Sequence, residues 1–290
     1  MSNYCIVTES TADLSAEIAK RFDIAVIPMH FRVGDNDYLN YPDNRELSPK
    51  AFYDLLREGR TSTTSAVNMA DFEDFFTPIL DSGKDILYLA FSSALSSTYS
   101  TGIIVADNLR EKYPDRKIVV VDTLAAAHGE GLLVCKAAKL RQLGLDIDEV
   151  ANWVEENRLN TALWFTVDDL MHLYRGGRVN AVSAHIGTAL GIKPLLHVDE
   201  QGYLKAMNKV RGRRQALEAL VKKMEELKSD ITGEMVMISH GDCIDDAKFV
   251  ADMVQKKFSP EEIIIGDVGP VIGSHTGPGV VTLFFFAKGR

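Results

Sequence analysis

The sequence predicts an α/β protein with two domains. The N-terminal domain is a doubly wound, mostly parallel sheet, and the C-terminal domain is α+β with a mixed or antiparallel sheet. In the first half, short apolar runs alternate with amphipathic helical stretches, as in repeated strand–helix–strand units. In the second half the elements alternate less regularly. No linker separates the halves, so we predict domains 1–158 and 159–290.

The first-half strands are apolar runs of the kind found in sheets covered on both faces. The expected strands are 4–10, 24–33 (divided at Pro28), 85–91 and 117–123. The expected helices are 11–22, 48–59 and 99–113. Thr11, or Ser10 before it, is the expected N-cap of the first helix. The second helix has a Ser-Pro start and a Gly stop.

The second half opens on an amphipathic helix and contains a hairpin that turns at Glu200, Gln201 and Gly202. The expected strands are 162–167, the two arms of 193–210, 234–241, 261–269 and 279–289. The expected helices are 145–160, 181–191 and 213–230. This order of elements favours a mixed sheet over a second parallel one.

Composition narrows the class of protein. At 290 residues, folding buries roughly 75% of the surface that the unfolded chain exposes. The net charge of −9 disfavours nucleic-acid binding, which needs a positive surface. The three cysteines are far apart, and the chain has neither a signal-peptide pattern nor an apolar run long enough to span a membrane. We therefore expect a cytoplasmic protein without a membrane span.

Common cofactor and nucleophile motifs are missing. The chain has no GxxxxGK[ST], HExxH or GxSxG pattern. The pair Gly129 and Gly131 lacks the third glycine of a dinucleotide fingerprint, because Val134 stands there. The histidines have no ligand-like spacing. We expect no cofactor, no metal and no catalytic residue of a self-sufficient enzyme.

Three hydroxyl-rich segments stand out: Ser10–Thr11, Thr61–Ser65 and Ser92–Ser93. Each is expected at one edge of the parallel sheet, where open α/β sheets bind ligands. Free N–H groups and helix N-termini at that edge favour an anion. Hydroxyls add neutral donors, which suit a carboxylate held without a fixed counter-charge. Taken singly, each segment is explained as well by helix caps and turns.

Two basic segments and one histidine can each be explained by a structural role or by a binding role. Arg175 and Arg178 flank two glycines, and a tight turn alone accounts for those glycines. Five basic residues lie between 205 and 214 in an acidic protein, either as a solvated surface or as a docking patch for an acidic partner. His275 lies in the Gly- and Pro-rich segment 269–279 and is explained equally well as a structural histidine.

These segments together resemble the DegV family over nearly the whole chain. The most specific matches are "LYRGGRVNAVSAHIGTALGIKPLLHVDEQG", "KVRGRRQAL" and "GPVIGSHTGPGVVTLFFFAKG", in that order; "TESTADL", "TSTTS", "SSALSSTYS" and "VDTLAAAHGEG" support them. The resemblance implies a protein that binds one long-chain fatty acid between two domains. It also implies a separate ATP-dependent kinase subunit that phosphorylates the bound carboxylate to an acyl phosphate.

The resemblance also implies roles for particular residues. The carboxylate is expected to meet Thr61 or Ser62 and also Ser93, with His275 close by. Arg178 is expected at the mouth, where the kinase's phosphate arrives. Arg211 and Arg213 are expected in a basic strip that docks the kinase. For the tunnel that holds the tail, the small-residue segment 181–196 supplies the candidate contacts Ile186, Leu190 and Ile192.

The chain departs from the family pattern at three places. Glu9 replaces the usual aspartate, Thr63 and Thr64 replace Gln-Pro, and Ser97 replaces a glycine. The last change narrows the approach of the backbone to the ligand if that position needs φ > 0.

Two other functions remain open. One is a self-sufficient hydrolase or transferase that uses Ser93 with His275, which requires the two side chains within hydrogen-bond reach. The other is a binding protein for a different apolar acid.

Overall fold

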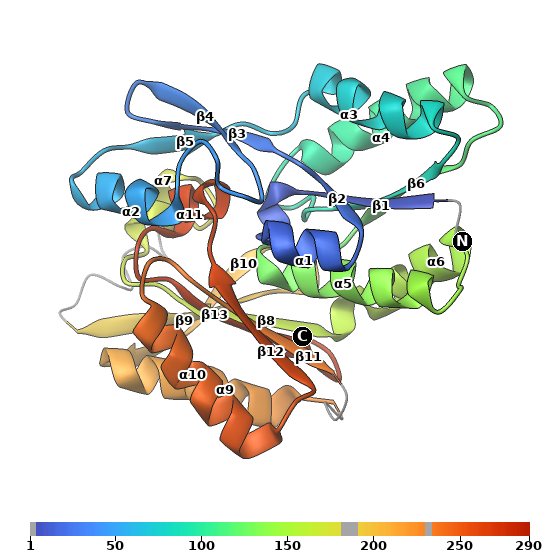
Figure 1. The fold of residues 1–290 in the computed structure, drawn as a ribbon. Helices are drawn as coiled ribbons and strands as arrows, with labels where there is room; N and C mark the ends of the chain where they lie inside the picture. Colours follow the sequence, from blue (N-terminus) through green and yellow to red (C-terminus); the bar gives the residue numbers. More distant parts are fainter. Residues whose placement is uncertain (1–3, 181–190, 230–233) are drawn as a thin grey trace.

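The computed structural model describes residues 4–180, 191–229 and 234–290, and their strands form three sheets (Figure 1). The first is parallel throughout, with the order β2-β1-β6-β7. Its strands are β1 (Tyr4–Glu9), β2 (Ile24–Ile27), β6 (Asp85–Ala90) and β7 (Ile118–Asp122). The prediction of a parallel N-terminal sheet is therefore confirmed.

Helices cover both faces of this sheet, as a doubly wound fold requires (Figure 1). Helices α3 and α4 pack on one face and α5 and α6 on the other, while α1 packs beside β2. Their bounds are α1 (Ala16–Arg21), α3 (Met69–Asp81), α4 (Thr98–Lys112), α5 (His128–Gln142) and α6 (Ile147–Asn157).

A small antiparallel sheet, with the order β4-β3-β5, stands beside the parallel one. Its strands are β3 (Met29–Val33), β4 (Asn36–Asn40) and β5 (Ser62–Thr64), and helix α2 (Pro49–Arg57) connects β4 to β5 in the chain. The split at Pro28 is as predicted. The segment Thr61–Ser65 is different from the prediction: it forms an edge strand of this small sheet and not a turn at the edge of the parallel sheet.

The third sheet has six strands in the order β10-β9-β8-β13-β11-β12. It is mixed, because only β11 and β12 run parallel, which confirms the fold class predicted for the C-terminal part. Its strands are β8 (Thr161–Thr166), β9 (Ile192–Val198), β10 (Leu204–Arg211), β11 (Met235–His240), β12 (Glu262–Asp267) and β13 (Val281–Phe286). Helices α9 (Arg213–Leu227) and α10 (Ile244–Phe258) cover its outer face.

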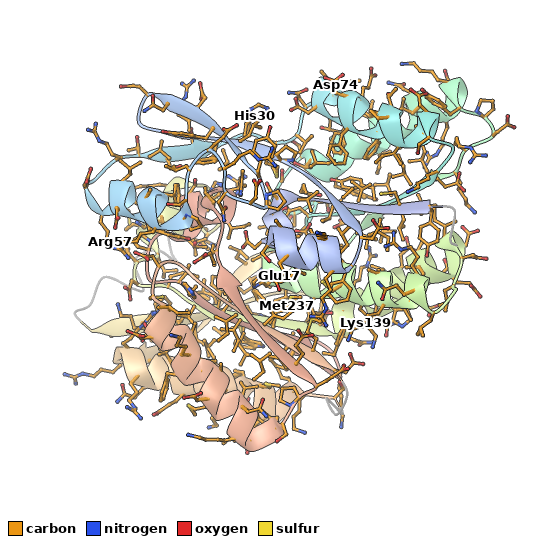
Figure 2. All side chains as sticks on the ribbon, in the orientation of Figure 1. Glu17, His30, Arg57, Asp74, Lys139 and Met237 are labelled. Atoms are coloured by element: carbon orange, nitrogen blue, oxygen red, sulfur yellow. The ribbon has the colours of Figure 1, made fainter. Side chains whose placement is uncertain are left out.

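Helix α5 fills the space between the parallel sheet and the six-stranded sheet. It contacts β1 on one side and β8, β11 and β13 on the other, and most of its residues are buried. Gly129 and Gly131, which do not form a dinucleotide fingerprint, have a packing role in this helix. A methyl group at Gly129 would overlap Leu163, and one at Gly131 would overlap the carbonyl oxygen of Ala12. Met237 is fully buried in this interior, whereas Arg57 and Asp74 lie on the outside (Figure 2).

The predicted start of the first helix is wrong. Residues Ser10–Ala12 form a 3-10 turn, and α1 begins only at Ala16 with Ser15 as its N-cap, whose Oγ accepts from the N–H of Ile18 at 3.3 Å. The interruption has a physical cause: Asp13 takes up a left-handed conformation with φ +54°, which ends the turn.

Two short helices bring the halves of the chain together. Helix α11 (Pro270–Thr276) packs against β3, β5 and α2 from the first half and against α7 (Met171–Arg175) from the second.

A second 3-10 turn, Arg158–Asn160, precedes β8. The domain boundary near residue 158 stays a prediction.

Candidate functional site

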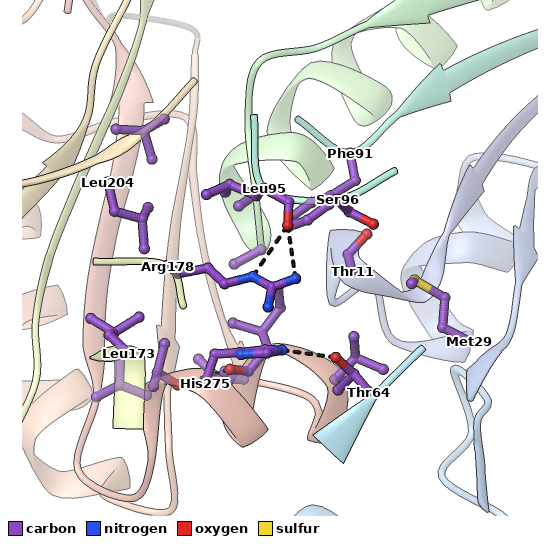
Figure 3. A pocket seen from close by; sticks show the side chains of 18 of the residues that line it. Thr11, Met29, Thr64, Phe91, Leu95, Ser96, Leu173, Arg178, Leu204 and His275 are labelled. Atoms are coloured by element: carbon purple, nitrogen blue, oxygen red, sulfur yellow. Dashed lines mark hydrogen bonds between the residues drawn. The ribbon is translucent and has the colours of Figure 1, made fainter. Parts of the chain in front are cut away.

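An apolar cavity of about 220 Å³ lies where the three sheets meet (Figure 3). Its walls come from segments far apart in the sequence, such as Met29 on β3, Phe91 after β6 and Phe284 on β13. The other large apolar side chains in the wall are Leu95, Phe165, Leu173, Val198, Leu204, Val268, Val271, Ile272 and Val280. A few polar groups sit among them: Thr11, Thr64, Ser65, Ser96, Ser97, Arg178, His275, Thr276 and Thr282.

A second, polar cavity of about 520 Å³, here called the vestibule, shares Thr64, Arg178 and His275 with the apolar cavity. Its remaining lining residues are Leu56, Gly59, Arg60, Thr61, Ser62, Thr63, His172, Arg175, Gly176 and Ser274. The shared residues mark a junction at which an apolar chamber meets a polar one. An amphiphile suits such a pair of chambers, because its tail and its head group need different surroundings.

His275 stands at this junction on α11. Its Nε2 atom lies 2.8 Å from the Oγ1 atom of Thr64 on β5, and Figure 3 shows the contact. Burial and the nearby charge of Arg178 lower the pKa of His275 to about 4, so the imidazole is neutral at pH 7. Its Nδ1 atom is buried without a hydrogen-bond partner in the described part of the chain. Gly176 is needed beside it, because a methyl group there would overlap Nδ1.

Arg178 approaches the junction from the turn after α7. Its guanidinium donates to the carbonyl oxygen of Leu95 at 2.9 and 3.2 Å and also to that of Gly176. Within residues 4–180, 191–229 and 234–290 it has no ion pair, and burial lowers its pKa. Arg178 thus joins the segment 92–97 to the Arg-Gly-Gly-Arg segment, and no carboxylate of the described residues pairs with its charge.

Ser62 and Ser274 form a second link between β5 and α11, with their Oγ atoms 2.6 Å apart. The hydroxyl of Ser62 also lies 2.8 Å from the carbonyl oxygen of Arg32, and that of Ser274 lies 2.7 Å from that of Pro270. These contacts hold the vestibule wall in place.

Three of the four predicted carboxylate residues line the vestibule, and the fourth lines neither cavity. Thr61 and Ser62 line the vestibule, and His275 lines both cavities. Ser93 lines neither; its backbone N–H donates to Asp122 Oδ1 at 3.3 Å, and the same loop contributes Ser96 and Ser97 instead.

The other predicted residues lie elsewhere. Ile186 and Leu190 fall outside the described residues, and Ile192, at the start of β9, lines neither cavity. Arg211 is exposed at the end of β10. Arg213 is largely engaged within the protein, because its guanidinium pairs with Asp246 at 2.8 Å and lies 3.4 Å from Asp168.

Sequence reasoning missed Thr64, Ser65 and Ser96 as lining residues, although all three lie within segments that it singled out. Thr64 is one of the residues that depart from the family pattern, and it is the partner of His275. Ser97, another departure, has φ −76° and therefore fits without strain.

The third departure, Glu9, belongs to a buried acid pair behind the cavity wall. Glu9 Oε1 accepts from the N–H of Phe91 at 2.7 Å, and Glu130 Oε1 lies 2.7 Å from the hydroxyl of Thr8. The Thr8 hydroxyl also lies 3.0 Å from the carbonyl oxygen of Leu89. The Thr8 hydroxyl has a single proton to donate. A protonated Glu130 that donates to the Thr8 oxygen satisfies both contacts, because the Thr8 proton then goes to the carbonyl oxygen of Leu89. Burial raises the pKa of Glu130 well above its usual range and that of Glu9 to about 7.

Comparison with known proteins identifies the class. A family model described as "Uncharacterised protein, DegV family" matches residues 3–288. A DegV domain-containing protein of Clostridium perfringens is 43% identical over 285 residues, covering 98% of each chain, and one from Streptococcus pyogenes is 36% identical with the same coverage. The chain therefore belongs to the DegV family.

Solved structures show the same fold. A DegV lipid-binding protein from Thermotoga maritima superposes with a TM-score of 0.87 at 28% identity, covering 100% of both chains. A DegV family protein from Thermus thermophilus, described as fatty acid binding, gives a TM-score of 0.86 at 27% identity over 98% of this chain and 99% of its own. No helix in the described part of the present chain is long and apolar enough to cross a membrane.

Proposed function

We propose that this protein binds one long-chain fatty acid and presents its carboxylate to a separate ATP-dependent kinase. The observation that carries the proposal is the junction between an apolar cavity and a polar vestibule at Thr64, Arg178 and His275. The description of related DegV structures as lipid-binding or fatty acid binding supports the same ligand class.

The tail supplies most of the affinity in this proposal. Burying a methylene is worth about 0.8 kcal/mol, so about fourteen of them give on the order of 11 kcal/mol before the cost of ordering the chain. One head-group hydrogen bond contributes only about 0.5–1.5 kcal/mol net. The apolar wall therefore sets affinity, and the polar residues set orientation.

The carboxylate lies at the junction, facing the vestibule. Arg178 offers a positive charge that no described carboxylate neutralises, and burial lowers its pKa. Thr64 and neutral His275 fix the other side, with Thr61 and Ser62 on the vestibule wall. From the 92–97 loop, Ser96 takes the place that sequence reasoning gave to Ser93.

The kinase supplies the nucleotide, for which this chain has no sequence motif. In the transfer, a carboxylate oxygen forms a bond to the γ-phosphorus of ATP while the bond from that phosphorus to the ADP oxygen breaks. Acyl phosphate and ADP are the products. The exposed Arg211 is the better candidate for kinase docking, because Arg213 already pairs with Asp246.

The hydrolase alternative requires the side chains of Ser93 and His275 within hydrogen-bond reach, and the contacts of these two residues do not support it. The hydrogen bond of His275 goes to Thr64, and Ser93 lines neither cavity. A nucleophilic serine needs a base within hydrogen-bond reach.

Native mass spectrometry of the purified protein tests the ligand class. A bound mass equal to one fatty acid is the expected result, and titration of delipidated protein with a long-chain acid should restore it. A protein that stays empty after titration, or that carries a different class of molecule, overturns the proposal. Hydrolysis of a generic ester that is lost on Ser93→Ala would favour the alternative.

A further inference from the structure

A third cavity, of about 220 Å³, lies beside helix α1 and shares no lining residue with the apolar cavity or the vestibule. We call it the α1 cavity. Its walls come from the segments 10–18, 40–49 and 265–269, together with His128 at the start of α5. The proposed function makes no use of this cavity.

Two buried oxygen atoms of the α1 cavity have no hydrogen-bond partner in the part of the chain that the structure describes. They are Oδ2 of Asp13 and Oδ1 of Asn40, and Asn40 is only 6% exposed. The other oxygen of Asp13, Oδ1, accepts from the N–H of Gly269 at 2.9 Å, which fixes the side chain. Since an unpaired buried acceptor is costly, the two atoms favour a ligand that donates hydrogen bonds.

Gly269 leaves space beside these two side chains. A methyl group at this position would lie 2.8 Å from Asp13 Oδ1 and 3.0 Å from Asn40 Oδ1. Gly269 has φ −67°, a value open to any residue, so the backbone does not require glycine here. The requirement is for room between Asp13 and Asn40.

The titratable groups of the α1 cavity are acidic. Asp13 and Asp267 line it, and no lysine or arginine is among its described lining residues. His128 is neutral at pH 7, because burial lowers its pKa to about 4, and its Nε2 atom donates to the carbonyl oxygen of Asp13 at 2.9 Å. Burial also lowers the pKa of His240, which lies 3.7 Å from Asp267. Burial raises the pKa of Asp13 well above its usual range, and a cation beside it would favour the ionised form.

A cation with N–H donors fits this cavity better than a bare metal ion. Among the described residues, no group of three or more His, Cys, Asp and Glu side chains could hold a metal. The volume of about 220 Å³ also exceeds what one ion or water molecule needs. Leu14, Ile18 and Ile265 add an apolar wall, against which an aliphatic stem packs.

We propose that the α1 cavity binds a small aliphatic amine, whose ammonium group donates to Asp13 and Asn40. The second carboxylate, Asp267, suits a ligand that carries two ammonium groups. This inference does not rest on the proposed function, because the α1 cavity shares no lining residue with the two cavities assigned to the fatty acid.

Putrescine, a four-carbon diamine, is the probe, and the diol of equal chain length is its uncharged counterpart. Binding is measured by isothermal titration at neutral pH. The wild type is expected to bind putrescine with a Kd of about 1 mM or tighter, and the diol at least about tenfold more weakly. Asp13→Asn keeps an oxygen for the Gly269 N–H and should weaken putrescine binding by about tenfold or more.

Asp115→Asn is the control, because it removes one negative charge at an exposed position outside the α1 cavity. It should bind putrescine as the wild type does. Asp267→Asn is a second test that holds if Asp13→Asn does not fold, and it should weaken putrescine binding by about threefold or more. Melting curves from circular dichroism without ligand establish which variants are folded.

Three results would overturn the inference. The first is a wild type that does not bind putrescine, or that binds the diol equally well. The second is unchanged putrescine binding in the folded aspartate variants of the α1 cavity. The third is an equal loss in Asp115→Asn, which would show that net charge and not this cavity sets the affinity.

Discussion

The Nε2 atom of His275 lies 2.8 Å from the hydroxyl of Thr64, although 211 positions separate the two residues in the chain. This contact ties helix α11 to strand β5 at the junction of the apolar cavity and the vestibule. Because burial keeps the imidazole neutral, His275 acts as a polar group of fixed orientation and not as a cation.

Replacing His275 by Ala is expected to leave fatty acid affinity within about threefold and to lower acyl phosphate formation with the cognate kinase by about 100-fold. The tail carries the affinity, whereas His275 orients the reacting carboxylate. Acyl phosphate formation is measured with radiolabelled ATP. His30→Ala, at a half-exposed histidine outside both cavities, is the control. Unchanged phosphorylation in the His275 variant would remove this residue from the mechanism.

Gly176→Ala is expected to destabilise the protein by about 1–3 kcal/mol, because the added methyl group overlaps His275 Nδ1. Gly176 has φ −73°, so the cost is steric and not conformational. In the double variant Gly176→Ala, His275→Ala the overlap disappears. Urea denaturation should therefore show that adding His275→Ala recovers part of the free energy of unfolding that Gly176→Ala loses. The effects of the two substitutions are then not additive. Simple additivity would show that the two residues do not interact.

Leu204→Trp is expected to weaken binding of long-chain acids more than that of acids shorter by several carbons. Leu204 lies in the wall of the apolar cavity on β10, away from the junction, so a larger side chain there shortens the space for the tail (Figure 3). Tyr203→Trp, at a neighbouring residue that is 48% exposed and lines neither cavity, should leave the preference unchanged. Equal weakening for all chain lengths would place the tail elsewhere.

The buried pair Glu9 and Glu130 predicts a pH-dependent stability. A raised folded-state pKa means that the folded protein keeps protons that the unfolded chain releases. The associated stability is fully present below about pH 4.3, the usual pKa of glutamate, and is lost as the pH rises through about 7 for Glu9. Glu130→Gln keeps a donor for Thr8 without an ionisable group.

The free energy of unfolding of Glu130→Gln should therefore fall less between pH 5 and pH 8 than that of the wild type. Urea titrations at several pH values measure this slope. Glu111→Gln, at an exposed glutamate on α4, is the control and should follow the wild type. The same slope in the wild type and in Glu130→Gln would show that Glu130 does not hold a proton in the folded protein.

Local patterns predicted the strands and several helices well. Pro28 marks the break between β2 and β3, and the turn at 199–202 joins β9 to β10 as an antiparallel pair. Helix α5 was not predicted, because it is buried against two sheets and has no polar face to give a helical period. The pairing of β5 with β3 was also missed, since a three-residue strand has too short a pattern to show its partner.

The segments that form the site could be predicted from the sequence, but which of their side chains line the cavities could not. Sequence reasoning singled out the segments that contain Thr64, Ser96, Arg178 and His275, which the fold brings together. It chose Ser93 where Ser96 lines the cavity, because side-chain direction in a loop depends on backbone angles that no periodicity reveals. The meeting of Arg60, Arg175 and Arg178 in one vestibule is set by contacts distant in sequence, which no local pattern reveals.

A crystal structure of the protein with a long-chain fatty acid brominated at its terminal carbon tests the central claim most directly. The bromine's anomalous signal is predicted in the apolar cavity, near Leu204 and Phe284, with the carboxylate within hydrogen-bond distance of Thr64, Arg178 or His275. A bromine peak in the vestibule, or a protein that remains empty at saturating acid, would contradict the account.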